Sequence, residues 1–324
     1  MMPRLKRIKA RPKSTLSLCF GRNSTITLLF LLLFSASFII CAVPEATADS
    51  NGSYSVIVLP DTQGYSESNP DIFYSQTEWI AKNKKKLNIR LVIHLGDVVE
   101  DPKDHEEWQR ARKAINKLDG ENIPTLFAFG NHDCVQLKGE RSKNPFNRYF
   151  PIARYKTNGN YGGTYNDNSA DNVFMTFERG NEKYLFLSVE YRPREEVLEW
   201  AGGVLKKYSD HKAVLVTHSY MWPNGYHTNT GDQVWDKLAD RHPNVFMILC
   251  GHVPGSGVEI DYGENGNKVL EILTNYQYFS NGGNGFLRIL TFSPGKQNIQ
   301  VRTYSPYLDK YKKGPKNEFS FELK

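Results

Sequence analysis

The sequence predicts an α/β domain in which helices cover a parallel β-sheet. Short apolar or β-branched runs alternate with amphipathic segments from residue 54 to residue 134, and this order is typical of parallel strands joined by helical crossovers. A second alternation follows over 172–250, and turn signals separate further strand-like runs between 258 and 304. Hydrophobic residues make up 40% of the 324 residues, which is enough for one substantial core.

The first half of the domain is expected to hold three strands and two helices. The strands are the runs YSVIVL (54–59), RLVIHL (90–95) and PTLFAF (124–129). A helix near 71–83 is indicated because apolar residues recur seven apart, as a helix face requires. A charged helix near 106–118 follows the second strand. The result is a β-α-β-α-β unit.

The second half begins after a long polar stretch. Residues 135–171 are rich in Gly, Asn and Tyr, a composition typical of a functional loop, and we expect this loop to select the substrate. The elements expected after it are strands near 172–177, 184–190, 212–217 and 245–250, with helices near 194–207 and 233–240.

An exported destination is predicted by the first 48 residues. A basic start precedes the apolar run TITLLFLLLFSASFIICAV (25–43), and Ala46-Thr47-Ala48 then supplies an A-x-A cleavage signal. We expect a signal peptide over 1–48, followed by one secreted or periplasmic domain over 49–324. The alternative is an uncleaved N-terminal membrane anchor, because the 19 residues of this run could just span a bilayer.

The net positive charge of the chain comes entirely from this leader. The whole sequence carries 41 basic and 35 acidic residues, and residues 1–48 account for seven of the former and one of the latter, which leaves 34 of each. The remaining domain is formally neutral. The sequence therefore gives no support to a nucleic-acid partner.

Polar side chains follow the expected parallel strands at their carboxyl ends, where ligands of open α/β sheets bind. In chain order these groups are Asp61-Thr62-Gln63, Gly96-Asp97, Gly130-Asn131-His132-Asp133, Thr217-His218 and Gly251-His252. Each alone is typical of a turn or a helix cap, but together five strand ends bring carboxylates, a carboxamide and imidazoles to one edge. The other histidines of the domain are interpreted as structural (His94) or as surface residues: His105, His211, His227 and His242.

This series resembles the calcineurin-like metallophosphoesterases, in the correct order from residue 61 to residue 252. The GNHD of 130–133 is its most specific part. The leading LPDTQ (59–63) and the NGGNGFLRILTF of 281–292 further resemble an exported bacterial branch of that family. The resemblance implies a four-layer αββα sandwich, with two packed mixed β-sheets flanked by helices and a two-metal site at the strand ends.

The resemblance also implies roles for the site residues. Asp97 would bridge two ions, and Asn131, His218 and His252 would complete one metal position. His132 would serve as the general acid, with Asp133 orienting its imidazole and raising its basicity. This mixed nitrogen and oxygen set suits Mn, Fe or Zn better than Mg or Ca.

The second metal position departs from the family pattern. The family uses an Asp, a His two residues later, the bridging Asp and the second His of a Gly-His-x-His motif. Here Asp61 is followed by Gln63, a weaker neutral oxygen ligand, and the last His is replaced by Pro254, which offers no donor. Three interpretations stay open: one tight ion with a second weak one, loss of catalysis with ligand binding retained, or a substitute ligand from Cys134, Glu190 or Gln277.

The two cysteines of the domain each lie two residues from a predicted site histidine, since Cys134 follows His132 and Cys250 precedes His252. A disulfide that pins the site is one interpretation in an oxidising compartment. The other is a buried Cys250 at its strand end and an unpaired Cys134 on the loop. Sequence alone does not fix the separation of the two Cα atoms.

The expected function is hydrolysis of phosphate mono- or diesters through a metal-bound hydroxide. The substrate would be a phosphorylated small molecule or lipid, and the chain would contact a membrane only through an uncleaved N-terminal segment. The alternative is a catalytically silent exported protein that binds a metal or a phosphorylated ligand on the same fold. The substitutions at Gln63 and Pro254 favour that alternative, and the intact Asn131, His218 and His252 favour the enzyme.

Overall fold

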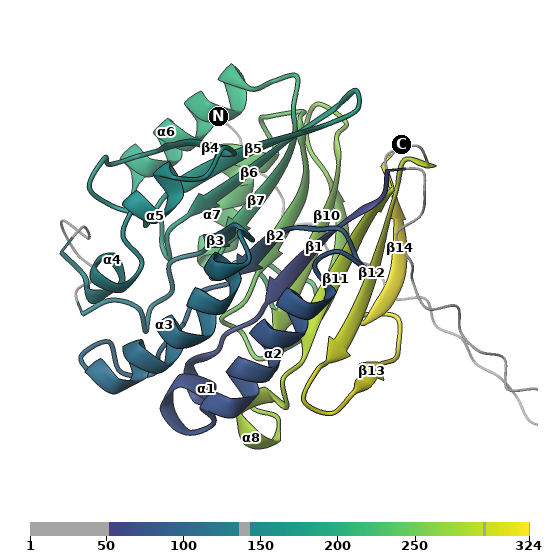
Figure 1. The fold of residues 1–324 in the computed structure, drawn as a ribbon. Coiled ribbons are helices and arrows are strands. Elements are labelled where there is room, and N and C mark those ends of the chain that lie inside the picture. The colour runs from purple at the N-terminus through teal and green to yellow at the C-terminus, as the bar shows by residue number, and fades with distance from the viewer. Residues whose placement is uncertain (1–51, 136–142, 294–295, 324) are drawn as a thin grey trace, which may run out of the picture. The chain divides into compact units, whose positions relative to one another are not determined.

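The computed structural model describes residues 52–135, 143–293 and 296–323 (Figure 1). The described residues belong to the compact unit Ala46–Lys324, and the predicted leader over 1–48 lies outside them. Within the described ranges, no helix has the length and apolar character needed to cross a membrane. The architecture below is that of this unit.

Two seven-stranded mixed sheets form the centre of the described unit. The first has the order β13-β12-β11-β1-β2-β3. The strand β14 also pairs with β12, along residues 298–302, whereas β13 pairs with residues 303–305. In it β1, β2 and β3 are parallel, whereas β11 is antiparallel to β1. Its strands are β1 (Tyr54–Leu59), β2 (Ile89–His94), β3 (Thr125–Phe127), β11 (Leu287–Ser293), β12 (Asn298–Ser305), β13 (Lys310–Lys312) and β14 (Glu318–Glu322).

The second sheet has the order β4-β5-β6-β7-β8-β10-β9. Its central strands β6, β7, β8 and β10 are parallel, and the outer strands are antiparallel to their neighbours. The strands are β4 (Tyr161–Thr164), β5 (Val173–Arg179), β6 (Glu182–Val189), β7 (Lys212–Thr217), β8 (Val245–Cys250), β9 (Gly255–Tyr262) and β10 (Lys268–Asn275).

The apolar core lies between the two sheets and beneath the helices. Along β7, Val214 and Val216 belong to the cluster shared with the first sheet, whereas Ala213 and Leu215 belong to the cluster under the helices. Successive side chains of a strand point to opposite faces. Burial on both faces therefore explains why the strand is a continuous apolar run rather than an alternating one.

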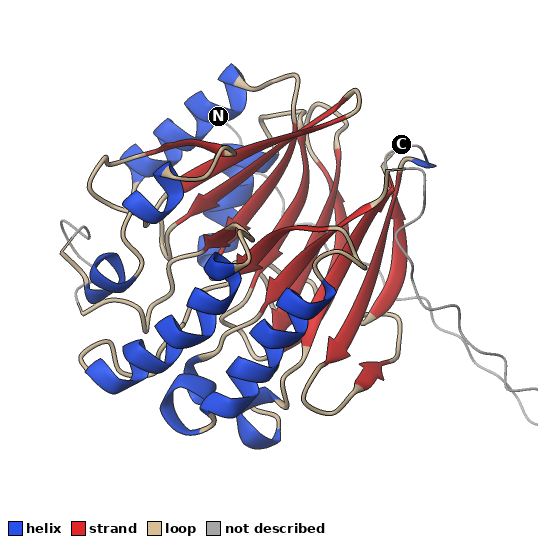
Figure 2. Cartoon of the chain, viewed as in Figure 1, coloured by secondary structure: helices blue, strands red, loops and turns tan. Residues whose placement is uncertain are grey.

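Helices cover both outer faces of the pair of sheets (Figure 2). On the first sheet α2 and α3 pack against each other (Figure 1), and α3 is capped by Asp104, whose carboxylate accepts from the backbone N–H groups of Glu106 and Glu107. The helical segments are α1 (Gln63–Ser68), α2 (Pro70–Asn83), α3 (His105–Gly120), α4 (Pro145–Tyr149), α5 (Ala153–Lys156), α6 (Glu195–Lys207), α7 (Asn229–Val234), the π-helix η1 (Trp235–Ala239) and α8 (Ser280–Gly283).

The predicted four-layer αββα sandwich is confirmed. The expected strands at 54–59, 212–217 and 245–250 coincide with β1, β7 and β8. The helix expected near 233–240 is wrong in its limits, because it begins at Asn229 under the Thr228 cap and ends as a π-helix. The stretch 135–171 is not wholly irregular, since α4, α5 and β4 lie in its described part.

Candidate metal centre

The predicted site residues come from the carboxyl ends of parallel strands in both sheets. Asp61, Asp97 and Asn131 follow β1, β2 and β3 of the first sheet. His218 and His252 follow β7 and β8 of the second sheet. The site therefore lies where the two sheets meet, and neither sheet holds all of it.

Glycines before the site residues let the strand ends approach closely. A Cβ on Gly96 (φ +95°) would come within 2.7 Å of His218 Nδ1, and one on Gly251 would lie 2.2 Å from Asp61 Oδ1. The next residues, Asp97 and His252, have left-handed φ values of 49° and 64°. Such backbone strain in non-glycine residues persists when surrounding structure enforces it, and it clusters at functional sites.

Three donor atoms gather around a fourth, His218 Nε2. Asp97 Oδ2 lies 3.0 Å away, Asn131 Oδ1 3.1 Å and His252 Nδ1 3.2 Å. Ligands of one transition-metal ion at about 2.0–2.2 Å are separated by about 3.0–3.4 Å. His218 Nδ1 donates to the Leu95 carbonyl at 2.7 Å, and this bond orients the ring with Nε2 toward the cluster. The spacing and orientation fit a single ion.

The electrostatics of the cluster favour one positive charge at its centre. Burial alone would lower the pKa of His218, but the Asp97 carboxylate outweighs it and raises that pKa to about 9. Burial and the nearby His218 charge lower the pKa of His252 to about 4. Burial works to raise the pKa of Asp97, yet the neighbouring His218 lowers it overall. The carboxylate thus stabilises a cation between two imidazoles that repel a second proton.

Asp61 adjoins this cluster through the His252 backbone but is not among Asp97, His218 and His252, whose ligand atoms lie within 4.8 Å of one another. Asp61 Oδ2 accepts from the His252 backbone N–H at 3.0 Å and from Asn275 Nδ2 at 2.8 Å. Gln63, the first residue of α1, donates through Nε2 to Glu100 at 2.5 Å. Its Oε1 is buried and accepts no hydrogen bond from the described residues. An orphaned amide oxygen beside a carboxylate fits a weak cation ligand.

The three candidate substitutes for Pro254 have different outcomes. Glu190 is wrong, because its buried carboxylate pairs with Arg194 at 2.9 Å and also accepts from Asn172. Cys134 packs in the apolar core and belongs to neither metal-competent cluster of the described residues. Gln277 has a buried Oε1 with no hydrogen-bond partner in the described part of the chain, so it stays a candidate.

The interpretation that Cys134 and Cys250 form a disulfide is wrong, because both cysteines are buried and neither is disulfide-bonded. Cys134 lies in the core that the two sheets share, whereas Cys250 lies in the core under the helices of the second sheet. The side chains thus belong to different apolar layers. The interpretation of Cys250 as a buried residue at its strand end is confirmed.

His132 lies at the site as predicted, but Asp133 does not orient it. The two Asp133 oxygens accept from the Val98 and Gly130 backbone N–H groups at 2.7 and 2.9 Å, so this carboxyl joins the loops after β2 and β3. Burial raises its pKa to about 7. His132 Nδ1 instead donates to the Glu100 carbonyl at 2.7 Å. Reasoning from the motif missed Glu100 because it follows Asp97 by three residues and belongs to no motif.

Two further residues that support the site were missed. Asn275 donates to Asp61 and, at 3.0 Å, to the His252 carbonyl. The ring of Tyr191 packs against His218 and His252, with centroids 5.7 and 5.2 Å apart. Asn275 ends the parallel strand β10, so the rule that located the other ligands could have found it.

A cavity of about 600 Å³ opens beside His252. Its wall includes Tyr191, Arg192 and Trp222, whose indole is 51% exposed. None of the described residues of the 135–171 stretch lines it. The expectation that this stretch selects the substrate therefore finds no support in the cavity, which is built by the segments after β6, β7 and β8.

The structural interpretation of His94 is confirmed. Its ring is fully buried, accepts from the Gly96 N–H at 3.2 Å and bonds Thr62 Oγ1 at 2.9 Å. Burial lowers its pKa to about 3. The interpretation of His211 as a surface residue is wrong, because it is buried and pairs with Asp210 at 2.7 Å.

The fold and the cluster of metal-competent side chains agree with what the family resemblance predicted. The sequence matches the calcineurin-like phosphoesterase family over residues 54–256. The chain belongs to that family. It is also 35% identical over 295 residues to the uncharacterized protein YvnB of Bacillus subtilis (strain 168), a match that covers 87% of this chain and 22% of the relative. The chain thus spans about a fifth of that relative's length.

Solved structures share the fold at low sequence identity. A dimetal phosphatase from Danio rerio aligns with a TM-score of 0.54 and 11% identity, covering 84% of this chain and 99% of that one. Purple acid phosphatase PPD1 from yellow lupin (Lupinus luteus) seeds aligns with a TM-score of 0.55 and 12% identity, covering 83% and 53% respectively. At this identity the likeness is one of fold alone.

Proposed function

We propose that this protein is a metal-dependent phosphoesterase that hydrolyses phosphate mono- or diesters. One observation carries the proposal: Asp97, Asn131, His218 and His252 reach a common point from four separate strands, with donor atoms 3.0–3.2 Å from His218 Nε2. Membership of the calcineurin-like phosphoesterase family supports the reaction class.

The tight ion would be held by those four residues, and their mixed donors suit Mn, Fe or Zn. Asp61, Gln63 and Asp97 would hold a second ion more weakly, because Pro254 supplies no ligand and the Gln63 oxygen is neutral. When bound, the ions activate a water molecule and neutralise the charge that develops on the phosphoryl oxygens.

The side chains around the ions would position the substrate and move a proton. His132 is fixed by its Nδ1 bond to Glu100, so Nε2 is the atom that can donate a proton to the leaving oxygen. Its side chain is 32% exposed, which leaves it accessible to a substrate. The leaving group would occupy the cavity beside His252, between Tyr191 and Trp222.

We also propose that the substrate is a phosphorylated small molecule or lipid met outside the cytoplasm. This rests on the basic and apolar pattern of the leader and on the Ala46-Thr47-Ala48 signal. The D-T-Q motif of residues 61–63 would mark an exported branch of the family. Edman sequencing of the mature protein beginning at Asp49 would support cleavage, and an intact N-terminus in the membrane fraction would favour the anchor.

Metal content and turnover together test the function. We expect one tightly bound ion per chain and Mn-stimulated hydrolysis of a generic aryl phosphate diester or monoester. His132→Asn should lower kcat by about 10²–10⁴-fold while metal content stays unchanged. His242→Gln is the matched control, because His242 bonds the Leu238 carbonyl and belongs to neither metal-competent cluster of the described residues. A metal-replete wild type with no turnover on either ester would overturn the proposal in favour of a catalytically silent binding protein.

A further inference from the structure

A second cluster of metal-competent side chains lies outside the candidate metal centre. It joins His227, in the turn before α7, to Asp261 of β9 and Glu271 of β10, and their ligand atoms all lie within 4.8 Å of one another. His227 Nε2 is 3.1 Å from both Glu271 oxygens and 3.9 Å from Asp261 Oδ2. The interpretation of His227 as a surface residue is wrong, because its side chain is only 10% exposed.

The strand register concentrates negative charge at this place. Glu271 lies directly opposite Glu259 in the β9–β10 pair, and Asp261 is two residues further along β9, on the same face of the sheet. Like charges directly opposite each other destabilise an antiparallel pair. Glu271 is fully buried, so a nearby cation is required to offset its charge.

Among the described residues, the cationic group paired with Glu271 and Asp261 is the His227 imidazole. Its ring contacts Glu271 and Asp261 through Nε2, and Asp232 lies 3.7 Å from Nδ1. No lysine or arginine of the described residues forms an ion pair with Glu271 or Asp261. One imidazolium therefore faces three carboxylates, and the cluster keeps an excess of negative charge.

The spacing of the donor atoms suits a bound ion. Atoms that share one ion at about 2.0–2.2 Å are about 3.0–3.4 Å apart, and the separations of 3.1 Å between His227 and Glu271 fall in this range. Asp261 Oδ2, 3.9 Å from His227 Nε2, lies outside it and would have to move closer to share the ion. Tyr220 donates its hydroxyl to Glu271 Oε1 at 2.5 Å, the kind of outer contact that orients a ligating carboxylate. His227 also lines the 600 Å³ cavity, which gives an ion access from solvent.

We propose that His227, Asp261 and Glu271 bind a divalent transition-metal ion, Zn²⁺ or Mn²⁺, at a site separate from the centre around His218. One nitrogen and several carboxylate oxygens are a ligand set that these ions accept. The ion replaces the proton of His227 as the countercharge and releases it on binding. It fastens the turn that carries His227 to β9 and β10 and so fixes one wall of the cavity.

Zn²⁺ titration of the metal-stripped full chain tests this site without reference to catalysis. The background is Asp97→Asn, which weakens the candidate metal centre, and isothermal calorimetry measures the remaining Zn²⁺ equivalents. We expect Asp261→Asn in that background to weaken one equivalent by at least about tenfold and His227→Gln to remove it. His242→Gln in the same background is the matched control and should leave binding unchanged.

The proposal is overturned if the Asp97→Asn protein and its Asp261→Asn and His227→Gln derivatives bind Zn²⁺ alike. Circular dichroism checks that each variant is folded, and the partly exposed Asp261 provides a test that does not disturb a buried residue. A second readout is proton release: the calorimetric heat should depend on the buffer for the Asp97→Asn protein and lose that dependence with His227→Gln. Failure here leaves the phosphoesterase proposal standing.

Discussion

The two sheets make different contributions to the candidate metal centre. The first supplies oxygen donors, from Asp61, Asp97 and Asn131, and the second supplies the imidazoles of His218 and His252. An ion at the junction therefore gains a mixed ligand set that neither sheet could provide. The packing of one sheet on the other is therefore what brings the ligands of the site together.

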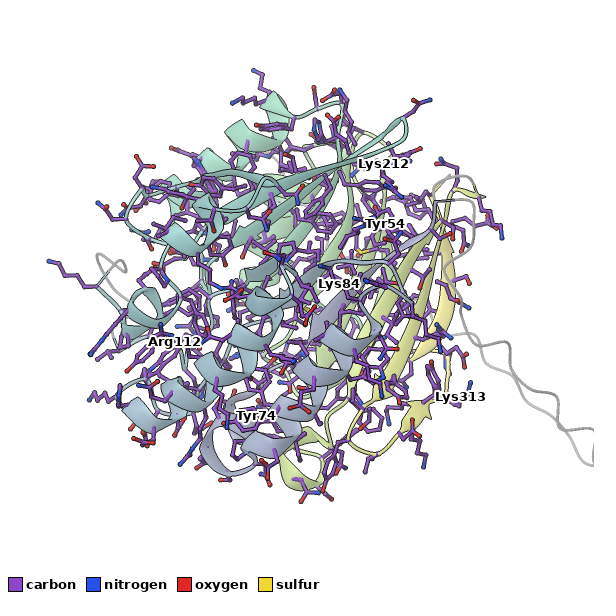
Figure 3. All side chains as sticks on the ribbon, viewed as in Figure 1. Tyr54, Tyr74, Lys84, Arg112, Lys212 and Lys313 are labelled. Atoms are coloured by element: carbon purple, nitrogen blue, oxygen red, sulfur yellow. The ribbon has the colours of Figure 1, made fainter. Side chains whose placement is uncertain are left out.

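At the opposite end of the sheets, a second junction holds no metal-competent cluster among the described residues. Figure 3 labels Tyr54 and Lys212, the first residues of β1 and β7, at this end. There Lys212 pairs with Glu182 at 2.5 Å, and Gln297, beside the first sheet's β12, bonds both at 3.0 and 2.8 Å. This contact also joins the sheets, and Gln297 has a left-handed φ of 49°. Lys212 and Glu182 neutralise each other, however, so the pair offers no net charge to attract an ion.

The largest expected effect comes from removing the shared oxygen ligand. Asp97→Asn keeps the shape of the side chain but removes the charge that attracts the ion, so tight metal binding should be lost. The loss of several kcal/mol of transition-state stabilisation corresponds to a fall in kcat/KM of about 10⁴-fold. Metal analysis after dialysis and a phosphodiester assay check this. Unchanged metal content would show that the ion does not depend on the Asp97 carboxylate.

A smaller effect is expected from the residue that links the two contributions. Asn275→Ala removes the hydrogen bonds from the second sheet to Asp61 and to the His252 carbonyl. Outer contacts of this kind are worth about 10–100-fold in metal affinity, and the second, weaker ion should be affected most. Mn²⁺ titration followed by electron paramagnetic resonance measures it. Equal affinities in wild type and variant would mean that Asp61 needs no support from the second sheet.

At Pro254 the second sheet lacks an imidazole that the family pattern has, and a substitution can add it. Pro254→His restores the nitrogen donor that the family pattern has at this position, and the weak ion should bind at least about tenfold more tightly. Pro254→Ala is the matched control, since it removes the ring without adding a ligand. Metal stoichiometry by mass spectrometry should rise toward two only in the histidine variant; the same value in both would refute the assigned gap.

The smallest effect is expected at the far junction. Glu182→Gln breaks the ion pair with Lys212 and should cost about 0.5–1 kcal/mol of unfolding free energy, with no change in metal binding. Partial burial tends to raise the pKa of Glu182, but bonds from Lys212 and Gln297 lower it overall. The stabilisation from this ion pair is thus present above the pKa that Glu182 has in the unfolded chain. It is lost as the pH falls through the pKa of Glu182 in the folded protein.

Urea unfolding at pH 7 and at pH 3 checks this sign. The difference between wild type and the Glu182→Gln protein should shrink at the lower pH, because acidification toward the lowered pKa of Glu182 removes the carboxylate charge. A difference that grows on acidification would contradict the lowered pKa. A change in metal content would show that the two ends of the sheets are coupled.

Local sequence determined most of the strands and the residues at their ends. Short β-branched apolar runs such as 54–59 and 212–217 predicted buried strands, which the structure has there, and polar residues after the strands, such as Gly96-Asp97 and Gly251-His252, were already visible in the sequence. The family resemblance rather than periodicity indicated two sheets, because the sides of a fully buried strand look alike in sequence.

Tertiary structure alone decided which polar groups meet. Asp133 adjoins His132 in the chain but bonds the backbone of Val98 and Gly130, whereas Glu100, from another loop, takes its expected place. His227 likewise acquired its carboxylate neighbours from strands that follow it by more than thirty residues. Hydrogen bonds and charges act through space, so proximity along the chain determines neither.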